Sequence, residues 1–245
     1  KRLLNKSYWI IWGGDLYGAK RDKINDYVRK NFKGYIGESE KKTLLERYGK
    51  NGTFYKPYYT FPISPSVLNH IKVSRHDYIK IQINNSCDDS TLEMLDILFK
   101  FKDKNIKITT ILSYGKLEYK QRIINKGKEL FGDRFEYIDK YLPSGEYASY
   151  LSENDILILN QNRQQGFGNV VASLYLGKKV YIKSDISLYE YFKNNGVKIY
   201  NTNDICGMEF DEFITNNSSV QNQNGVLKFF DEKYLAKLWG EFFDA

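Results

Sequence analysis

The sequence predicts an α/β fold whose parallel β-sheet carries helices on both faces. From residue 78 onward, short strand-like runs alternate with longer segments in which apolar residues recur at helical spacing. The run at 156–159 is apolar throughout, as expected of a parallel strand that is buried on both faces. With 245 residues, the chain can form one large or two small domains around a core that needs no disulfide or metal. These observations favour a doubly wound sheet.

The second part of the chain supplies most of the predicted elements. The capping-box sequence Ser90-Thr-Leu-Glu93 marks the start of its first helix. Ligands of doubly wound sheets bind beyond the carboxyl ends of the strands, which places loops 84–90, 113–118 and 160–169 at a common edge. The predicted strands are 79–83, 107–112, 135–138, 156–159, 180–182 and 197–200, and the predicted helices cover 90–99, 117–131, 144–152, 169–176 and 187–194.

The first part of the chain begins with a predicted strand from Tyr8 to Trp12, which ends at a Gly-Gly turn. Residues 20–33 predict a basic amphipathic helix, which either packs on a sheet or touches lipid headgroups. Residues 54–65 hold three of the four prolines and predict a short strand, an extended linker and hence a domain boundary. The apolar face of the predicted helix consists of Ile24, Tyr27, Val28 and Phe32.

Two further segments close the chain. The polar stretch 215–225 predicts a surface loop, and residues 234–243 predict an amphipathic helix. The chain starts at Lys1 rather than at a methionine, which indicates a fragment.

The net charge of +7 is unevenly distributed. Residues 1–80 hold 17 Lys and Arg against 7 Asp and Glu, a balance of +10, whereas residues 81–245 hold 20 against 23. This asymmetry points to an anionic partner of the first part, either nucleic acid or an anionic membrane surface. The alternative is a solvated basic face without a partner.

Composition excludes several classes of protein. Cys87 and Cys206 lie far apart in the sequence, and no C-x-x-C motif supports a zinc site or a disulfide framework. The two histidines, His70 and His76, have no metal-ligand spacing, so we assign them no role. The sequence has no run of about 18 apolar residues and no signal peptide. A reducing, cytoplasmic setting fits these features best.

The segment 155–174 carries the strongest functional signal. A buried strand is followed by a polar loop with Gly166 and Gly168, and then by an apolar helix. The first N–H groups of a helix lack intrahelical partners and favour anions, and Arg163 adds a guanidinium suited to phosphate. The segment matches neither a G-x-G-x-x-G fingerprint nor a Walker loop. Phosphate binding and an ordinary βα loop are both compatible with this spacing.

Two other loops hold polar side chains after predicted strands. Asn84, Asn85, Ser86, Asp88 and Asp89 can hydrogen-bond a base, a ribose or a sugar, or they can cap a helix and form a turn.

Asp15 follows the first strand at the Gly-Gly turn. It is either an exposed general base or the N-cap of a following helix.

Three co-linear segments resemble one family of enzymes. The segments are Trp9-Ile-Ile-Trp-Gly-Gly-Asp-Leu-Tyr17, Ile81-Gln-Ile-Asn-Asn-Ser-Cys-Asp-Asp-Ser90 and Arg163-Gln-Gln-Gly-Phe-Gly168. They resemble the motifs W-x-x-W-G-x-[DE]-L-Y, G-N-S-x-D-x-S and R-Q-Q-G-x-G of the TDP-N-acetylfucosamine:lipid II N-acetylfucosaminyltransferases, glycosyltransferase family 56. The likeness runs from about Tyr8 to Tyr200.

The resemblance implies a GT-B architecture, with two Rossmann-like domains and a cleft between them. Residues 1–66 would form the later part of the acceptor-side domain, with about a hundred upstream residues of the family absent. Residues 67–76 would form a linker, and 77–205 the nucleotide-sugar domain. Residues 206–245 would form a helical segment that packs back on the N-terminal domain.

The resemblance also implies partners and a setting for the protein. The donor would be a TDP-sugar, and the acceptor an undecaprenyl-pyrophosphate-linked saccharide at the inner face of the cell membrane. The basic first part would face the anionic membrane surface. No cofactor, no metal ion and no nucleic acid is expected.

The family's motifs carry over to named positions. Asp15 would be the catalytic base. The donor would be held by Asn85, Ser86, Asp88, Arg163, Gln164, Gln165, Gly166, Gly168 and Asn169. Departures occur at Asn84, Cys87 and Asn169, and the family's Asn-Pro-Phe-Trp is here only Asp185-Ile-Ser-Leu. The donor sugar can therefore differ from N-acetylfucosamine.

Two alternatives remain open. One is another enzyme of the same fold that uses a nucleotide-sugar to make capsule or O-antigen. The other is a non-catalytic module for single-stranded nucleic acid, which would use basic charge and the 16% of aromatic residues. No RNP, KH or helix-turn-helix signature favours the second alternative.

Overall fold

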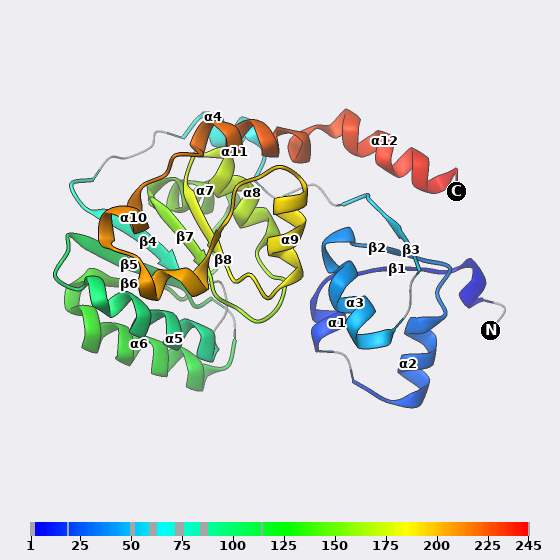
Figure 1. The fold of residues 1–245 in the computed structure, drawn as a ribbon, viewed down its shortest axis with the longest axis horizontal. Coiled ribbons are helices and arrows are strands. Elements are labelled where there is room, and N and C mark those ends of the chain that lie inside the picture. Colours follow the sequence, from blue (N-terminus) through cyan, green and yellow to red (C-terminus); the bar gives the residue numbers. More distant parts are fainter. Residues whose placement is uncertain are drawn as a thin grey trace.

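The computed structural model contains two parallel β-sheets, one on each side of the segment that links them (Figure 1). The second sheet, with its helices, forms the larger part of the molecule. The structure describes residues 3–18, 20–49, 52–58, 63–71, 76–83, 88–113 and 115–244.

The larger sheet has six strands in the order β6-β5-β4-β7-β8-β9, and all neighbours are parallel. The order reverses between β4 and β7, because the chain first winds outward through β5 and β6 and then returns to the other side of β4. The predicted doubly wound parallel sheet is thereby confirmed. The strands are β4 (Ile79–Ile83), β5 (Ile106–Ile111), β6 (Phe135–Ile138), β7 (Ile156–Leu159), β8 (Lys179–Ile182) and β9 (Tyr200–Asn201).

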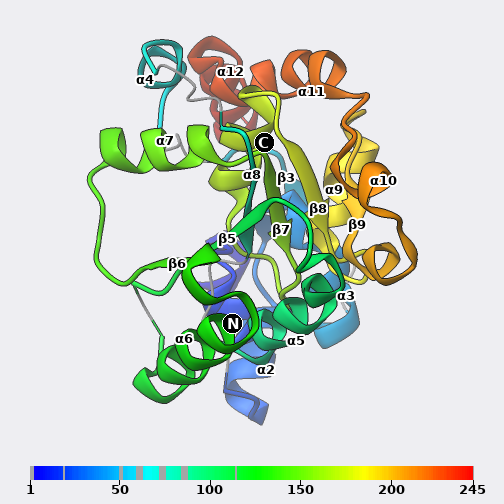
Figure 2. The same cartoon turned by 90° about the vertical axis from the view of Figure 1, so that its left-hand side faces the viewer.

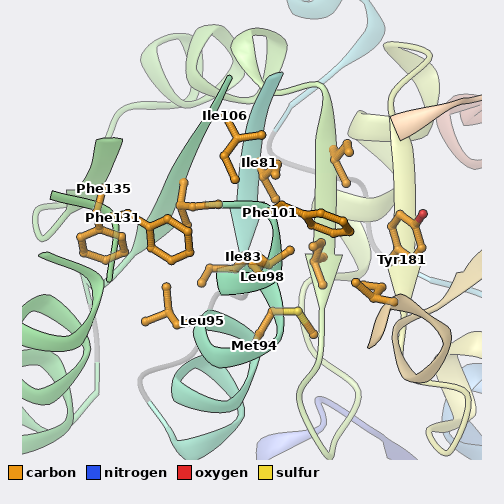
Figure 3. Close-up of a cluster of buried hydrophobic side chains, with 14 of the residues drawn as sticks. Ile81, Ile83, Met94, Leu95, Leu98, Phe101, Ile106, Phe131, Phe135 and Tyr181 are labelled. Atoms are coloured by element: carbon orange, nitrogen blue, oxygen red, sulfur yellow. The ribbon is translucent and has the colours of Figure 1, made fainter. Parts of the chain in front are cut away.

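Helices cover both faces of this sheet (Figure 2). Because side chains alternate along a strand, Ile156 and Ile158 of β7 enter one core cluster, whereas Leu157 and Leu159 enter another. Figure 3 shows the first cluster, in which Ile81 and Ile83 pack against the helix over 89–98. The helices after β4 and β5 cover this face, and those after β6, β7 and β8 the other. They are α5 (Asp89–Leu98), α6 (Leu117–Phe131), α7 (Ser144–Glu153), α8 (Phe167–Tyr175) and α9 (Ser187–Asn194).

The smaller sheet has three short parallel strands in the order β1-β2-β3. Trp9, Tyr35 and Tyr48 form the centre of its core, together with the fully buried Leu16 and Leu44. Sequence analysis did not predict β2 or the helix after it. The elements are β1 (Tyr8–Ile10), α1 (Gly14–Tyr17), α2 (Lys23–Lys30), β2 (Gly34–Ile36), α3 (Lys41–Tyr48) and β3 (Thr53–Tyr55), and the link to the larger sheet contains α4 (Pro65–Asn69).

The basic helix α2 differs from its prediction in how it packs. Ile24 is 77% exposed and Tyr27 40% exposed, and no residue of α2 is buried. Of the predicted apolar face, only Val28 and Phe32 are partly buried, and Phe32 contacts Trp9.

The C-terminal segment returns to the smaller sheet (Figure 1). Phe242 makes edge-on contacts with Tyr8 of β1 and Tyr55 of β3, with ring centroids 4.8 and 5.0 Å apart. Between these strands, Gly34 has no room for a side chain, because a Cβ would lie 2.6 Å from the Tyr55 ring. The segment contains α10 (Phe210–Ile214), α11 (Ser219–Val226) and α12 (Glu232–Phe243).

The predicted surface loop at 215–225 is wrong for most of its length, because α11 occupies residues 219–226. The buried amide of Asn222 hydrogen-bonds the backbone N–H and carbonyl of Lys198, and Val226 is fully buried. These tertiary contacts stabilise a helix in a segment of low intrinsic helix propensity.

Candidate functional site

The carboxyl ends of the strands in both sheets point toward the space between the sheets. In the larger sheet, the loop at 160–166 follows β7 and lies where the strand order reverses. Asn160, at the start of this loop, is 2% exposed. Its Nδ2 donates to Glu93 Oε2 at 3.0 Å, and its Oδ1 accepts from Thr202 Oγ1 at 2.8 Å. One buried amide therefore joins the loop after β7 to α5 and to the 3-10 helix Thr202–Gly207 that follows β9.

The glycine loop is held in place by its own side chains. Gln161 is fully buried, and its Nε2 donates to the carbonyl of Gln165 at 2.8 Å. Arg163 Nε donates to Gln165 Oε1 at 3.1 Å. Gly166 is the N-cap of α8 with φ 78°, a left-handed conformation that favours glycine. The N-cap residue Gly166 makes no side-chain cap, and the first N–H groups of a helix have no intrahelical acceptor.

The predicted donor residues after Gly166 occupy the start of α8. The helix begins at Phe167, two residues before the predicted position, because Gly166 alone makes the turn. Gly168 therefore lies within the first helical turn and not in the loop, which corrects its predicted role in the turn. Asn169 lies in the same turn.

The loop after β4 is described only in part. Asn85 and Ser86 lie outside the described residues, as do Asn84 and Cys87. Asp88 is the N-cap of α5 and accepts hydrogen bonds from the backbone N–H and the hydroxyl of Ser90. Asp89 forms an ion pair with Arg122 at 3.4 Å. The capping alternative thus accounts for these contacts of Asp88.

Asp15 lies in α1, directly after the Gly13-Gly14 turn. Its Oδ2 accepts from the indole N–H of Trp9 at 2.6 Å, and its Oδ1 accepts from the backbone N–H of Trp12 at 2.9 Å. Gly13, with φ 75°, occupies the N-cap position that the sequence offered to Asp15 as an alternative. Asp15 therefore fixes the loop that carries Trp12, and each of its oxygens has a lone pair left for a further donor.

A cavity of about 420 Å³ lies between the two sheets. Trp12, which is 68% exposed, lines it from the N-terminal side. Gln164 of the glycine loop and Phe167 of α8 line it from the other side. Asp15 is not among the lining residues. The remaining wall consists of Ile10, Ile11, Ile36, Gly37, Glu38, Ser39, Lys56, Pro57, Tyr58 and Tyr191.

A second hollow of about 340 Å³ lies beyond the carboxyl ends of β5 and β6. Asn169 of α8 is part of its wall, so this hollow adjoins the N-terminus of α8. Its lining is mostly apolar and aromatic, which suits a planar ring. Sequence analysis missed these residues, although 113–118 was one of the predicted site loops. The other lining residues are Ile63, Ile111, Ser113, Ile138, Lys140, Tyr141, Leu142, Ser144 and Tyr147.

A buried carboxyl group that sequence analysis also missed lies near the cleft. Glu40 is 2% exposed and ends the short 3-10 helix η2 (Glu38–Glu40) after β2. Burial raises the pKa of Glu40 to about 7, and hydrogen bonds from Tyr17 and Ser187 oppose this effect. Its place just after the carboxyl end of β2 gave no signal in the sequence, because this three-residue strand was not predicted.

No group of His, Cys, Asp or Glu among the described residues has the arrangement of a metal site. In the part of the chain that the structure describes, no helix has the length and apolar character needed to cross a membrane.

The fold is similar to that of several solved glycosyltransferase structures. A glycosyltransferase from Rickettsia africae superimposes with a TM-score of 0.67 at 12% identity, over 96% of this chain and 69% of the other. Anabaena HepE in complex with UDP and glucose gives 0.69 at 15% identity, over 97% and 71%. A UDP-forming trehalose-phosphate synthase from Burkholderia xenovorans gives 0.70 at 8% identity, over 97% and 67%.

The sequence matches no protein-family model and no curated protein. At these low identities the structural likeness concerns the fold. Two parallel sheets face each other across a cleft, and a C-terminal helix returns to the first sheet. The chain has the GT-B fold.

Proposed function

We propose that the protein is a glycosyltransferase that moves a sugar from a nucleotide-sugar to a lipid-linked saccharide. The observation that carries this proposal is the position of the N-terminus of α8, which lies with Arg163 at the reversal of the strand order and faces the interdomain cavity. This arrangement suits a diphosphate. The GT-B neighbours support it, because one of them is a complex with UDP and glucose.

The donor fits the described surfaces in one orientation. The diphosphate would lie at Gly166 and the first turn of α8, with Arg163 beside it. Asn169 adjoins both this turn and the second hollow, so the nucleobase would occupy that hollow. The sugar would then extend toward Gln164 and the interdomain cavity. Asn85, Ser86 and Asp88 remain proposed donor residues from the loop after β4.

In the reaction, an acceptor hydroxyl oxygen attacks the anomeric carbon, and the bond from that carbon to the phosphate oxygen breaks. The nucleoside diphosphate leaves with its negative charge stabilised by Arg163 and the α8 N–H groups. A preorganised donor of this kind typically contributes about 3–4 kcal/mol. Asp15 is our proposed base for the hydroxyl proton, since the carboxylate is oriented by Trp9 and Trp12.

The three motifs shared with glycosyltransferase family 56 favour a TDP-sugar donor of the N-acetylfucosamine type. They likewise favour an undecaprenyl-pyrophosphate-linked acceptor, as in enterobacterial common antigen synthesis. The loop after β8 departs from the family, because Asp185-Ile-Ser-Leu stands where the family has Asn-Pro-Phe-Trp. This departure keeps a second candidate, a related enzyme of capsule or O-antigen synthesis with another sugar.

The exposed face of α2 supports an anionic membrane surface as the partner on the acceptor side. Ile24 and Tyr27 project into solvent between the exposed Lys23 and Lys30. Asp26 is paired with Arg21 at 2.9 Å. Asp26 therefore does not neutralise the charges of Lys23 and Lys30. Such a helix can insert its apolar side chains at the headgroup boundary while lysines meet anionic lipid. The protein would act at the cytoplasmic face of the membrane.

A transfer assay tests the proposal. Membrane-bound polyprenyl-pyrophosphate saccharide is incubated with a panel of TDP-, UDP- and GDP-sugars, and the product is detected by mass spectrometry. We expect transfer from a TDP-sugar, with Asp15→Asn inactive but still able to bind nucleotide. Transfer from another nucleotide-sugar would favour the second candidate. A longer form of the protein that transfers nothing with any donor would refute the assignment.

A further inference from the structure

The two halves of the cleft meet at a buried polar contact. On the N-terminal side, the hydroxyl of Tyr17 on α1 contacts Glu40 of η2 and Thr43 of α3. On the C-terminal side, Ser187 begins α9, and its hydroxyl donates to Glu40. Glu40 thus connects Tyr17 to α9. This contact lies beside the cavity that Gln164 lines.

Glu40 is the centre of the contact. Its Oε2 accepts from the Tyr17 hydroxyl at 2.8 Å and from the Ser187 hydroxyl at 3.5 Å. Its Oε1 is fully buried, and among the described residues no donor reaches it. A buried carboxylate oxygen without a donor is strongly unfavourable when ionised, and protonation removes the charge whose burial is costly.

Burial and the charge of Asp15 favour the neutral form of Glu40, whereas the hydrogen bonds from Tyr17 and Ser187 lower its pKa. Asp15, on α1, adds a negative charge that raises the pKa of Glu40 in the same direction as burial does. Tyr17, also on α1, is itself a group whose pKa burial raises. The guanidinium of Arg47 on α3 is directed at the carbonyls of Leu16 and Tyr17.

Other neighbours do not supply a cation to Glu40. Ser187 faces it from α9 with a neutral hydroxyl, and Gln164 is neutral. Glu38 and Lys41 flank it along its own segment, and the hydroxyl of Thr43 contacts Tyr17.

We propose that Glu40 is a positioning residue of the cleft, whose neutral carboxyl group holds the two domains in the closed arrangement by joining Tyr17 to Ser187. This inference rests on the proposed function, because it takes the closed cleft to be the place where the sugar is transferred. Opening the cleft would bring Glu40 into water, where the carboxyl group ionises at its ordinary pKa near 4.5. Closing therefore takes up a proton.

The direction of the pH dependence follows from this linkage. The pKa of Glu40 is raised in the closed form to about 7, so closure is fully favoured below pH 4.5 and weakens as the pH rises to about 7. Above about pH 7 the loss in the closing equilibrium no longer changes with pH. The shift corresponds to a loss in the closing equilibrium on the order of 100-fold.

Small-angle scattering and hydrogen exchange at pH 5 and pH 8.5 test the proposal without any substrate. The wild-type chain is expected to have a larger radius of gyration at pH 8.5 and, after correction for the intrinsic rise of amide exchange with pH, faster exchange at Tyr17 and the start of α9. Glu40→Gln, which copies the neutral acid, is expected to remain closed at both values. Glu46→Gln, which changes an exposed carboxylate on α3, is the matched control and is expected to behave as the wild type.

A carbon-13 titration of the wild-type carboxyl groups supplies a second measurement that does not depend on how the variants fold. We expect one glutamate, identified by its absence in Glu40→Gln, to titrate near pH 7. Titration of Glu40 near pH 4.5 would overturn the proposal. Equal pH responses of the wild type and Glu40→Gln, or no response in the wild type, would also overturn it. A chain that closes with pH but binds no nucleotide would refute only the proposed function.

Discussion

The two sides of the cleft are built very differently. The six strands of the larger sheet are covered by helices on both faces and feed two extensive core clusters. The smaller sheet has strands of three residues each, and a single cluster of six buried side chains supports it. Hydrophobic stabilisation grows with the apolar area that is buried, so the larger sheet is the more stable part.

This difference explains where each side obtains its rigidity. The glycine loop is positioned by buried amides within its own domain, namely Asn160 and Gln161. On the other side, Asp15 holds the loop with Trp12, but the strands below it are packed by the distant Phe242, which contacts Tyr8 and Tyr55. The proposed donor side is thus preformed, whereas the other side depends on the rest of the chain for support.

Replacing one buried leucine by alanine in each core tests this comparison most directly. Leu16 and Leu95 are both fully buried, one in each core. Each Leu→Ala change is expected to lower the free energy of unfolding by about 2–5 kcal/mol. Leu16→Ala should lower the midpoint temperature of a first unfolding transition, that of the smaller sheet, and leave nucleotide binding intact. Leu95→Ala should lower the midpoint temperature of the transition at which nucleotide binding is lost. A single transition, lowered equally by both changes, would show that the two sides unfold as one unit.

Arg163→Ala sharpens the comparison on the donor side. Removing the guanidinium should reduce transfer by about 10²–10³-fold and weaken nucleotide binding, because the leaving diphosphate loses its fixed positive partner. Steady-state kinetics and binding measurements give both effects. Arg134→Ala is the control, since that side chain binds only the carbonyl of Lys104 on the described surface, away from the cleft. Unchanged donor affinity in Arg163→Ala would contradict the assignment.

Gly166→Ala tests whether the loop is preformed. A side chain at φ 78° is expected to cost about 1–2 kcal/mol, and the strain would displace the start of α8. Gly196→Ala introduces similar strain at φ 75°, with nothing within 4 Å of the added Cβ. Both variants should lose stability to a similar extent, but only Gly166→Ala should bind nucleotide more weakly. Equal affinities would mean that α8 does not hold the diphosphate.

The exposed face of α2 carries the smallest expected effect. Replacing Ile24 and Tyr27 by serine should weaken binding to vesicles with anionic lipid by about tenfold or less, because two exposed apolar side chains can no longer insert. Co-sedimentation at several salt concentrations measures the change. Val220→Ser removes an apolar side chain of 67% exposure on α11 and is expected to leave vesicle binding unaltered. Strong binding to arbitrary oligonucleotides by the wild type would favour a nucleic-acid partner instead.

Sequence periodicity was sufficient for most of the larger sheet, since its helices are long and their apolar patterns are regular. It misplaced the last strand, which was predicted at 197–200 and is the two-residue β9 (Tyr200–Asn201). It was insufficient for β2, whose three residues Gly34–Ile36 carry no repeat, and for α11, which depends on Asn222. Glu40 could not be identified as buried, because its partners lie 23 and 147 residues away in the sequence. The glycine loop was recognisable because strand, loop and helix are adjacent in the chain.

Calorimetric titration of the chain and of Arg163→Ala with TDP, UDP and GDP, first without and then with Mg²⁺, tests the central claim most directly. We predict that the wild type binds TDP in preference to the other two, and that Arg163→Ala loses this binding. Preference for UDP or GDP would keep the donor site but change the donor. If neither this chain nor a longer form of the protein binds any of the three nucleotides, the glycine loop is not a donor site and the account is wrong.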